Sequence, residues 1–336
     1  MCTAQSNYGG YVQHSIPIAP LSHYKSAGWN RNLFMPRSSN TQGAIYMTIA
    51  MAFFSAGDAL SKSVISEMNA GQIMCMRGVI TSALVYLIAR HMGALRSWRI
   101  LLQPMVATRV ICEILAAATY ITALGMMPLA NASAILQSLP LVVTFGAVLF
   151  FGEPVGWRRM LAIFTGLIGV LIIVRPDADG FTAAALLCIA SVLVTAGRDL
   201  ATRKIDPEIP SLMITVITAM AVTVFGALLT PVLGGWKPVT TTSFSHIAVA
   251  AITVLVGYQC IIAAMRTGEI SFVAPLRYTS LIFSALLGWL FFFEVPDSWT
   301  VIGAAIVIAS GLYTFYREAK RRGAPVAQES EPRVPV

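Results

Sequence analysis

Ionisable side chains stand at helical spacing inside long apolar stretches of this chain. Asp58 and Lys62 are four residues apart, and so are Asp199 and Arg203. Residues at positions i and i+4 share one face of a helix, where opposite charges can pair. A charge inside a membrane span costs about 2.5–3.5 kcal/mol on the insertion scale, so it should face protein or water. We interpret the two pairs as candidate gates; the alternative is two static ion pairs near helix ends.

A third pair has the same spacing and joins Arg109 to Glu113. An arginine can bind a carboxylate or phosphate through two parallel hydrogen bonds, and a buried carboxyl group can take up a proton. We therefore expect Arg109 and Glu113 to contact a substrate, with Glu113 as a candidate carrier of a coupling proton. The alternative is an internally neutralised pair that only positions its helix.

Arg277 is the best single candidate for an anion contact, because it follows Pro275 in an apolar stretch. Proline removes a backbone donor and loosens a helix, and Pro140 is expected to bend its helix in the same way. The alternative for Arg277 is a bond between helices. Polar and aromatic residues complete a candidate binding cavity, in which a planar ring can stack on tyrosine, although packing between helices is the commoner use: Tyr120, Asn131, Gln137, Tyr258, Gln259 and Tyr278.

Three other charged residues are assigned to the fold. Arg77 is expected to pair structurally or to extend toward the membrane surface. Glu153 and Glu294 end apolar runs, and their recurrence suggests that they satisfy backbone donors at the start of the next helices. We do not count them among the substrate contacts.

Covalent chemistry finds no support in the sequence. The four histidines do not stand at metal-ligand spacing or beside a serine inside a span. The five cysteines are scattered singly, which argues against a disulfide framework or a zinc site. No ATP-binding GxxxxGK[ST] motif occurs. We expect no metal, no cofactor and no enzyme activity, while an intramembrane enzyme or a channel-like permease stands as the alternative.

Composition places these residues in a membrane. Hydrophobic residues make up 57% of the 336 residues and charged residues only 11%, whereas soluble domains carry about 25% charged residues. A membrane-spanning helix needs about 20 apolar residues, and backbone groups in lipid must be satisfied internally. We expect an all-α polytopic membrane protein whose ten transmembrane helices lie near 44–64, 71–90, 104–125, 131–151, 158–174, 181–202, 211–233, 245–265, 270–293 and 299–316.

The chain repeats itself weakly at a spacing of 141 residues. Asp58-Ala-Leu-Ser-Lys62 recurs as Asp199-Leu-Ala-Thr-Arg203, and Phe150-Phe-Gly-Glu153 recurs as Phe291-Phe-Phe-Glu294. Such internal repeats are typical of secondary transporters. Each half has five spans, so the second half enters the membrane inverted relative to the first. We expect a first repeat at 43–176, a second at 180–318 and a hinge at 175–180.

The distribution of cations predicts the orientation. With both termini inside, the cytoplasmic segments hold most of the 23 Lys and Arg residues, and the outer ends hold only Lys62, Arg175 and Lys237. The net charge of +8 thus reflects topology rather than binding of nucleic acid. Residues 1–42 and 319–336 are expected to be disordered cytoplasmic tails, with a translation start at Met35 or Met47 as an alternative for the first.

Two long segments resemble the EamA domain of the drug/metabolite transporter superfamily. In the first half the resemblance lies in Ala123–Pro140, Phe151-Gly-Glu-Pro154 and Gly166–Pro176, and in the second half in Gly268–Tyr278, Gly288–Glu294 and Gly311–Glu318. It covers about residues 44–318.

The resemblance implies a ten-helix secondary transporter of the bacterial inner membrane, working by alternating access as the halves rock about a site near the midplane. The sequence looks closest to members that carry amino acids or their derivatives, S-adenosylmethionine or riboflavin. Membrane lipid and a small-molecule substrate are the expected partners, with proton coupling and a monomer or homodimer. Glycines at 166, 169, 303 and 311 are expected to allow close helix packing, with a dimer contact as the alternative.

Overall fold

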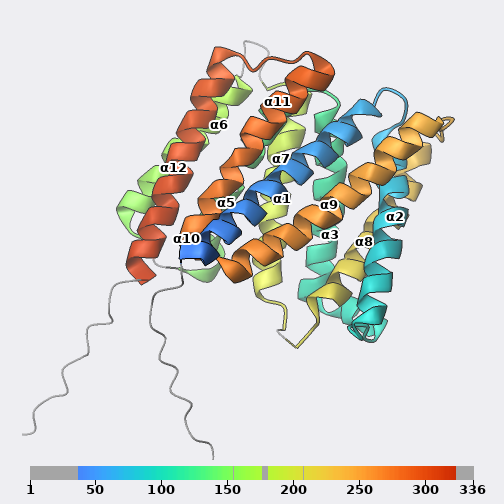
Figure 1. Ribbon diagram of the computed structural model, residues 1–336, viewed down its shortest axis with the longest axis horizontal. Coiled ribbons are helices and arrows are strands. Elements are labelled where there is room, and N and C mark those ends of the chain that lie inside the picture. The colour runs from blue at the N-terminus through green and yellow to red at the C-terminus, as the bar shows by residue number, and fades with distance from the viewer. Residues whose placement is uncertain (1–36, 154, 176–180, 207, 323–336) are drawn as a thin grey trace, which may run out of the picture. The chain divides into compact units, whose positions relative to one another are not determined.

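The computed structural model describes residues 37–153, 155–175, 181–206 and 208–322, which are largely helical (Figure 1). Ten segments of this part of the chain are long and apolar enough to cross a membrane. The described ranges contain no β-strand. The all-α architecture with ten transmembrane helices is confirmed, and with five spans in each repeat the two repeats run in opposite directions.

The helices follow the expected spans with a few differences. They are α1 (Arg37–Ser63), α2 (Ala70–His91), α3 (Pro104–Leu124), α4 (Leu129–Leu136), α5 (Leu139–Phe151), α6 (Trp157–Val174), α7 (Ala183–Arg203), α8 (Ser211–Val232), α9 (Thr241–Thr267), α10 (Ile270–Val273), α11 (Ser280–Phe292) and α12 (Ser298–Arg322), with 3-10 helices η1 (Trp98–Leu102) and η2 (Ala274–Thr279). Helix α1 thus begins inside the range expected to be a tail, and α12 continues to Arg322, inside the range of the second expected tail. The remaining parts of both tails and most of the hinge lie outside the described residues.

Two expected helices are broken near the middle of the membrane. The span at 131–151 divides into α4 and α5, and Pro140 stands in the first turn of α5. The span at 270–293 divides into α10, η2 and α11, and Pro275 stands in the first turn of η2. Proline is tolerated in the first turn of a helix, where its missing N–H leaves no bond unmade. Both prolines therefore act as expected, and interrupted spans of this kind often mark binding sites in transporters.

The principal helix contacts join the two repeats rather than lying within one. Helix α1 packs on α9, α2 on α8, α3 on α7 and α6 on α12, and Figure 1 shows α6 beside α12 on the left and α2 beside α8 on the right. The repeat exchanges α1–α9 with α7–α3, so the contacts are themselves symmetric. Rocking of one sequence half against the other, as expected from the sequence, would have to separate these interfaces.

Two mixed groups of spans emerge from these contacts instead. The six-span group consists of α1, α2, α3, α7, α8 and α9, and the four-span group consists of α4–α5, α6, α10–α11 and α12. Helices α1 and α7, which correspond in the two repeats, carry most of the contacts between the groups. We call the two ends of the bundle the Lys62 end, where α1 finishes, and the Arg203 end, where α7 finishes.

Glycines bring α6 and α12 together within the four-span group. A Cβ atom at Gly303 would lie 2.6 Å from the carbonyl oxygen of Gly169, and one at Gly169 would lie 2.9 Å from the carbonyl oxygen of Gly303. Gly166 and Gly311 also face neighbouring side chains of this chain, Leu141 and Tyr278. The packing interpretation of these glycines is thus confirmed, since all four are used within one chain.

We expect Gly303→Val to destabilise the protein by about 1–3 kcal/mol, because added side-chain atoms in a close-packed contact force the helices apart. Thermal unfolding of the purified protein in detergent measures the effect. Gly156→Ala is the control, since a Cβ at Gly156 would meet no atom of another described residue within 4 Å, its chain neighbours aside. Equal unfolding midpoints for Gly303→Val and wild type would contradict the contact.

Candidate functional site

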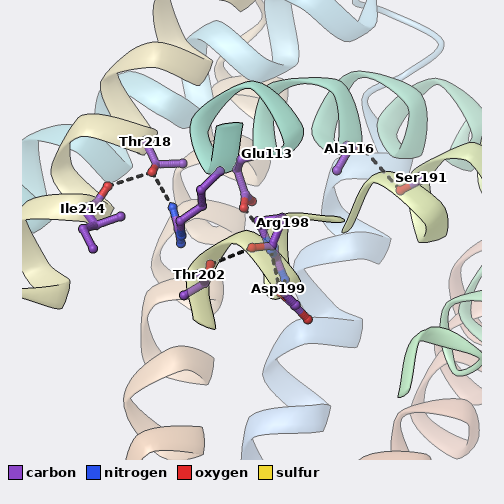
Figure 2. A network of polar contacts seen from close by, with 9 residues as sticks. Glu113, Ala116, Ser191, Arg198, Asp199, Thr202, Ile214 and Thr218 are labelled. Atoms are coloured by element: carbon purple, nitrogen blue, oxygen red, sulfur yellow. Dashed lines mark hydrogen bonds and ion pairs between the residues drawn. The ribbon is translucent and has the colours of Figure 1, made fainter. Parts of the chain in front are cut away.

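A charged network joins α3 to α7 in the half of the bundle nearer the Arg203 end (Figure 2). Arg198 Nη1 donates a hydrogen bond to Glu113 Oε2 at 2.9 Å. Arg198 Nε and Nη2 donate to Asp199 Oδ1 at 2.9 and 2.7 Å. The side chains of Arg198, Glu113 and Asp199 are 20%, 23% and 37% exposed. One guanidinium facing two carboxylates leaves a net negative charge that water or a ligand can reach.

Arg109 lies one turn from Glu113 on α3 but bonds to α8. Its Nη1 donates to Thr218 Oγ1 at 2.6 Å, and Thr218 Oγ1 donates to the carbonyl oxygen of Ile214. The buried Arg109 Nε has no hydrogen-bond partner in the described part of the chain. The charge of Arg109 still acts electrostatically on Glu113 and Asp199, so the site as a whole can balance its charges.

The expected direct pair between Arg109 and Glu113 does not form. Spacing by four residues places both side chains on one face of α3, but Arg198 reaches Glu113 from α7 and takes its carboxylate. A guanidinium on a facing helix can point directly at a carboxylate, whereas two side chains that leave the same helix in parallel directions meet less freely. The sequence places Arg109 and Glu113 on the correct helix face, but it does not predict that Glu113 pairs with Arg198.

Two of the expected cavity residues stand beside this network on α9. Tyr258 is 47% exposed, and its ring meets that of Phe54 edge to face at 5.1 Å between centroids. Its hydroxyl group lies within electrostatic range of Glu113 and Arg198. Gln259 is also exposed. Almost half of the Tyr258 surface therefore lies outside the packed core, with its hydroxyl group near the ion-paired groups.

The repeat shows what is special about the network. In the equivalent pair of helices, α9 and α1, the positions that correspond to Glu113 and Arg198 are Val254 and Gly57. There α1 and α9 pack closely, since a Cβ atom at Gly57 would lie 3.1 Å from Val254 Cγ2 and 2.9 Å from Thr253 Oγ1. The same interhelical contact is therefore closed by small and apolar groups in one place and holds an ion pair in the other.

Asp58 occupies a second polar site, between α1 and α3 in the half nearer the Lys62 end. Tyr120 Oη donates to Asp58 Oδ2 at 2.8 Å. Arg77 Nη1 donates to Ser61 Oγ at 3.3 Å, and its charge acts on Asp58 without a direct ion pair. The hydroxyl group of Tyr120 thus bonds to a carboxylate, and its ring packs against the buried core.

The breaks in the two interrupted spans meet near the middle of the bundle. The buried Gln137 donates to the carbonyl oxygen of Arg277 at 2.9 Å and also to Ser280 Oγ. The guanidinium of Arg277 is half-buried and has no bonding partner among the residues described. Tyr278 is only 7% exposed and packs against Gly311. In this form Tyr278 therefore cannot stack on a substrate ring, whereas Arg277 has its donors free.

Asn131 lies apart from the other candidates. It lines a cavity of about 340 Å³ at the Lys62 end, together with Met126, Ile135, Ile173 and Thr182 among others. Its Oδ1 accepts a hydrogen bond from Thr300 Oγ1 at 3.3 Å. The largely apolar lining of this cavity offers no charge to a polar ligand. The structure thus separates Asn131 from the network around Arg198, instead of joining all the predicted cavity residues.

The expected gate pairs are wrong in their partners. Lys62 does not pair with Asp58 but with Glu294, whose Oε1 lies 2.5 Å from Lys62 Nζ. Arg203 does not pair with Asp199 but with Glu153, at 3.2 Å between Nη1 and Oε1. Both bonds run from the six-span group to the four-span group, because Lys62 and Arg203 end their helices beside the turns that carry these glutamates.

Glu294 also differs from the role expected of it. Its Oε2 accepts the N–H of Leu129 at the start of α4, not a donor at the start of α12. Sequence reasoning missed Arg198, Thr218 and the partnership of both glutamates. A signal for the glutamates was present, since Lys62, Arg203, Glu153 and Glu294 all recur at the same spacing of 141 residues. Arg198 and Thr218 have no matching residue in the other repeat and left no such signal.

Ten membrane-length helices in two related sets, with charged side chains held between them, define a polytopic membrane protein of the two-repeat type. The sequence profile of the EamA-like transporter family matches residues 41–175 and 182–316. The chain belongs to the EamA-like transporter family. A solved crystal structure supports the fold, with a TM-score of 0.59 and 17% identity over 85% of this chain and all of the other.

Curated relatives are transporters with different substrates. The pseudopaline exporter CntI of Pseudomonas aeruginosa is 26% identical over 80% of this chain and 94% of its own length. The riboflavin transporter of Vibrio cholerae is 32% identical over 58% of this chain and 65% of its own. The S-adenosylmethionine uptake transporter of Rickettsia bellii is 25% identical over 59% and 67%. Family and relatives confirm that this chain is a multi-pass membrane transporter of small molecules and not an enzyme.

Proposed function

We propose that this protein is a secondary active transporter of the bacterial inner membrane that moves a small polar metabolite by alternating access. The substrate carries a carboxylate or another anionic group together with a cationic or planar part. Amino acids and their derivatives, S-adenosylmethionine and riboflavin are the compounds of this class that the relatives and the resemblance suggest. Both termini face the cytoplasm, because most lysines and arginines then lie on the inner side.

One observation carries the position of the binding site. The Glu113–Arg198 ion pair joins α3 to α7 at the position where the equivalent helices α9 and α1 have the close contact of Val254 with Gly57. A charged pair at that depth costs more than an apolar contact unless it faces water or a ligand. Its replacement of a sealed contact is therefore best explained by a ligand that exchanges hydrogen bonds with these charges.

Groups beside the ion pair and at the break between α10 and α11 suggest how a ligand binds. Arg109 bonds to Thr218 rather than to a carboxylate, and Arg277 makes no hydrogen bond or ion pair to any described residue, so each is a candidate to receive an anionic group. Glu113 and Asp199 supply acceptors for a cationic part, and Tyr258 offers an exposed ring. Substrate binding would then loosen the hydrogen bonds of Arg198, which hold α3 against α7.

We expect a bound substrate to raise the thermal unfolding midpoint of the purified protein. A ligand at 100 times its Kd adds about 2.7 kcal/mol to the free energy of unfolding. Riboflavin, S-adenosylmethionine and the common amino acids are the probes. Arg109→Ala should raise the ligand concentration needed for the same shift by about tenfold or more, since a charge-assisted hydrogen bond contributes about 1.5–3 kcal/mol.

Arg99→Ala is the matched control, because it removes the same charge from an exposed site in η1. A probe whose shift survives Arg109→Ala unchanged would contradict the assignment of this site. If no probe at millimolar concentration shifts the midpoint or enters proteoliposomes, the proposed substrate class is wrong. Uptake with and without an imposed proton gradient, in wild type and Glu113→Gln, tests the coupling role proposed for Glu113.

A further inference from the structure

We propose that Lys62–Glu294 and Arg203–Glu153 are two equivalent latches that close opposite ends of the transport path. This inference rests on the proposed alternating access and adds to it the residues that hold each end shut. The latches are not contacts within one helix. Each ties the end of a six-span helix, α1 or α7, to the turn after a four-span helix, α11 or α5.

The repeat relates the two latches residue for residue. Lys62 corresponds to Arg203 and Glu294 to Glu153, so exchange of the repeats turns one pair into the other. The turns that carry the glutamates also correspond. Gly152 and Phe293 both adopt left-handed backbone, with φ of 64° and 56°, at the ends of α5 and α11. Such a conformation costs a residue with a side chain about 1–2 kcal/mol. Phe293 adopts it despite this cost, so that the turn has the same backbone as the one at Gly152.

The Lys62 latch is sealed. The side chains of Lys62 and Glu294 are only 10% and 23% exposed. Lys62 Nζ also donates to the carbonyl oxygen of Met127 at 2.7 Å, and Glu294 accepts the N–H of Leu129 at 2.8 Å. The latch therefore fastens α1 and the turn after α11 to the chain just before and at the start of α4. The ring of Phe292 lies 5.2 Å from Lys62 Nζ.

The Arg203 latch is open to water. Arg203 and Glu153 are 51% and 49% exposed, and their bond is 3.2 Å long. Phe151, which corresponds to Phe292, is here contacted by Lys204 at 4.8 Å from its ring centroid. Exposed ion pairs contribute little to stability, whereas breaking a buried pair is costly. The Arg203 end should therefore open first, and the exposed Tyr258 and Gln259 lie on that side of the bundle.

Distances between spin labels at each end test the latches without any substrate. One pair of labels, at Ser66 and Ser298, joins the two groups at the Lys62 end, and a second pair, at Glu208 and Gly156, joins them at the Arg203 end. All four sites are exposed, and the native cysteines are replaced beforehand. We expect Glu294→Gln and, independently, Lys62→Met to shift the Lys62-end distances to longer and broader values and to shorten those at the Arg203 end.

Glu153→Gln should lengthen the distances at the Arg203 end and leave those at the Lys62 end unchanged. Glu318→Gln is the matched control, because its partner Arg159 ties α6 to α12 within the four-span group, and it should move neither distribution. Unchanged Lys62-end distances in both Glu294→Gln and Lys62→Met proteins that elute as monodisperse particles would overturn the proposal. Because no substrate is used, this result is separate from a failure of the proposed transport, which the uptake assay reports.

Discussion

Replacing Arg198 with alanine is expected to destabilise the protein by about 3 kcal/mol. Arg198 bonds to both Glu113 and Asp199, so its removal leaves two carboxylates without a cation partner between α3 and α7. Removal of one partner from a buried ion pair costs about 3–5 kcal/mol. We take the lower figure, because these side chains retain contact with water.

Thermal unfolding in detergent measures the loss, and Arg198→Lys is the matched control that keeps the charge. The double variant Glu113→Gln with Arg198→Ala should recover part of the stability, because residues in contact are not additive. Substrate-dependent stabilisation should disappear together with Arg198. A midpoint for Arg198→Ala within the scatter of wild type would show that the network does not hold α3 to α7.

Replacing Arg277 with alanine is expected to abolish transport and to leave stability unchanged. The guanidinium of Arg277 makes no hydrogen bond or ion pair to any residue that the structure describes, while its backbone carbonyl keeps the bond from Gln137. Little of the fold is therefore lost with the side chain. An anionic substrate group would lose two charge-assisted bonds of about 1.5–3 kcal/mol each, which is a loss of roughly a hundredfold or more in affinity.

The measurement is uptake into proteoliposomes, with the thermal unfolding midpoint recorded on the same preparations. Arg266→Ala is the control, because it removes an equal charge from an exposed position at the end of α9. Full transport by Arg277→Ala would exclude this residue as the anion contact. A fall in stability without a change in affinity would instead assign Arg277 to helix packing.

Hydropathy and repetition were enough to predict the helices of this protein. Apolar length fixes where a chain can cross a bilayer, and the prolines at 140 and 275 lie at the two breaks because proline is tolerated in the first turn of a helix but weakens a helix interior. The glycines at 169 and 303 were assigned to packing for an equally local reason. Each of these inferences uses properties that a residue keeps regardless of its neighbours in space.

The partners of the charged residues were not predictable in the same way. Spacing by four residues places Asp58 with Lys62, and Arg109 with Glu113, on a common helix face. It does not say which facing helix presents a better partner, and that depends on how the helices are rotated and crossed. Glu294 for Lys62 and Arg198 for Glu113 come from distant parts of the chain. The spacing of 141 residues was the one sequence feature that could have linked the latch residues.

The packing of α3 on α7 has a consequence for how the protein is made. Helix α3 leaves the ribosome well before α7 is translated, so Glu113 enters the membrane when Arg198 does not yet exist. During that interval the nearest cation on the nascent chain is Arg109, one turn away on the same helix. The pair that the finished structure does not use would then neutralise α3 during insertion, and Arg198 would displace it when the second repeat arrives.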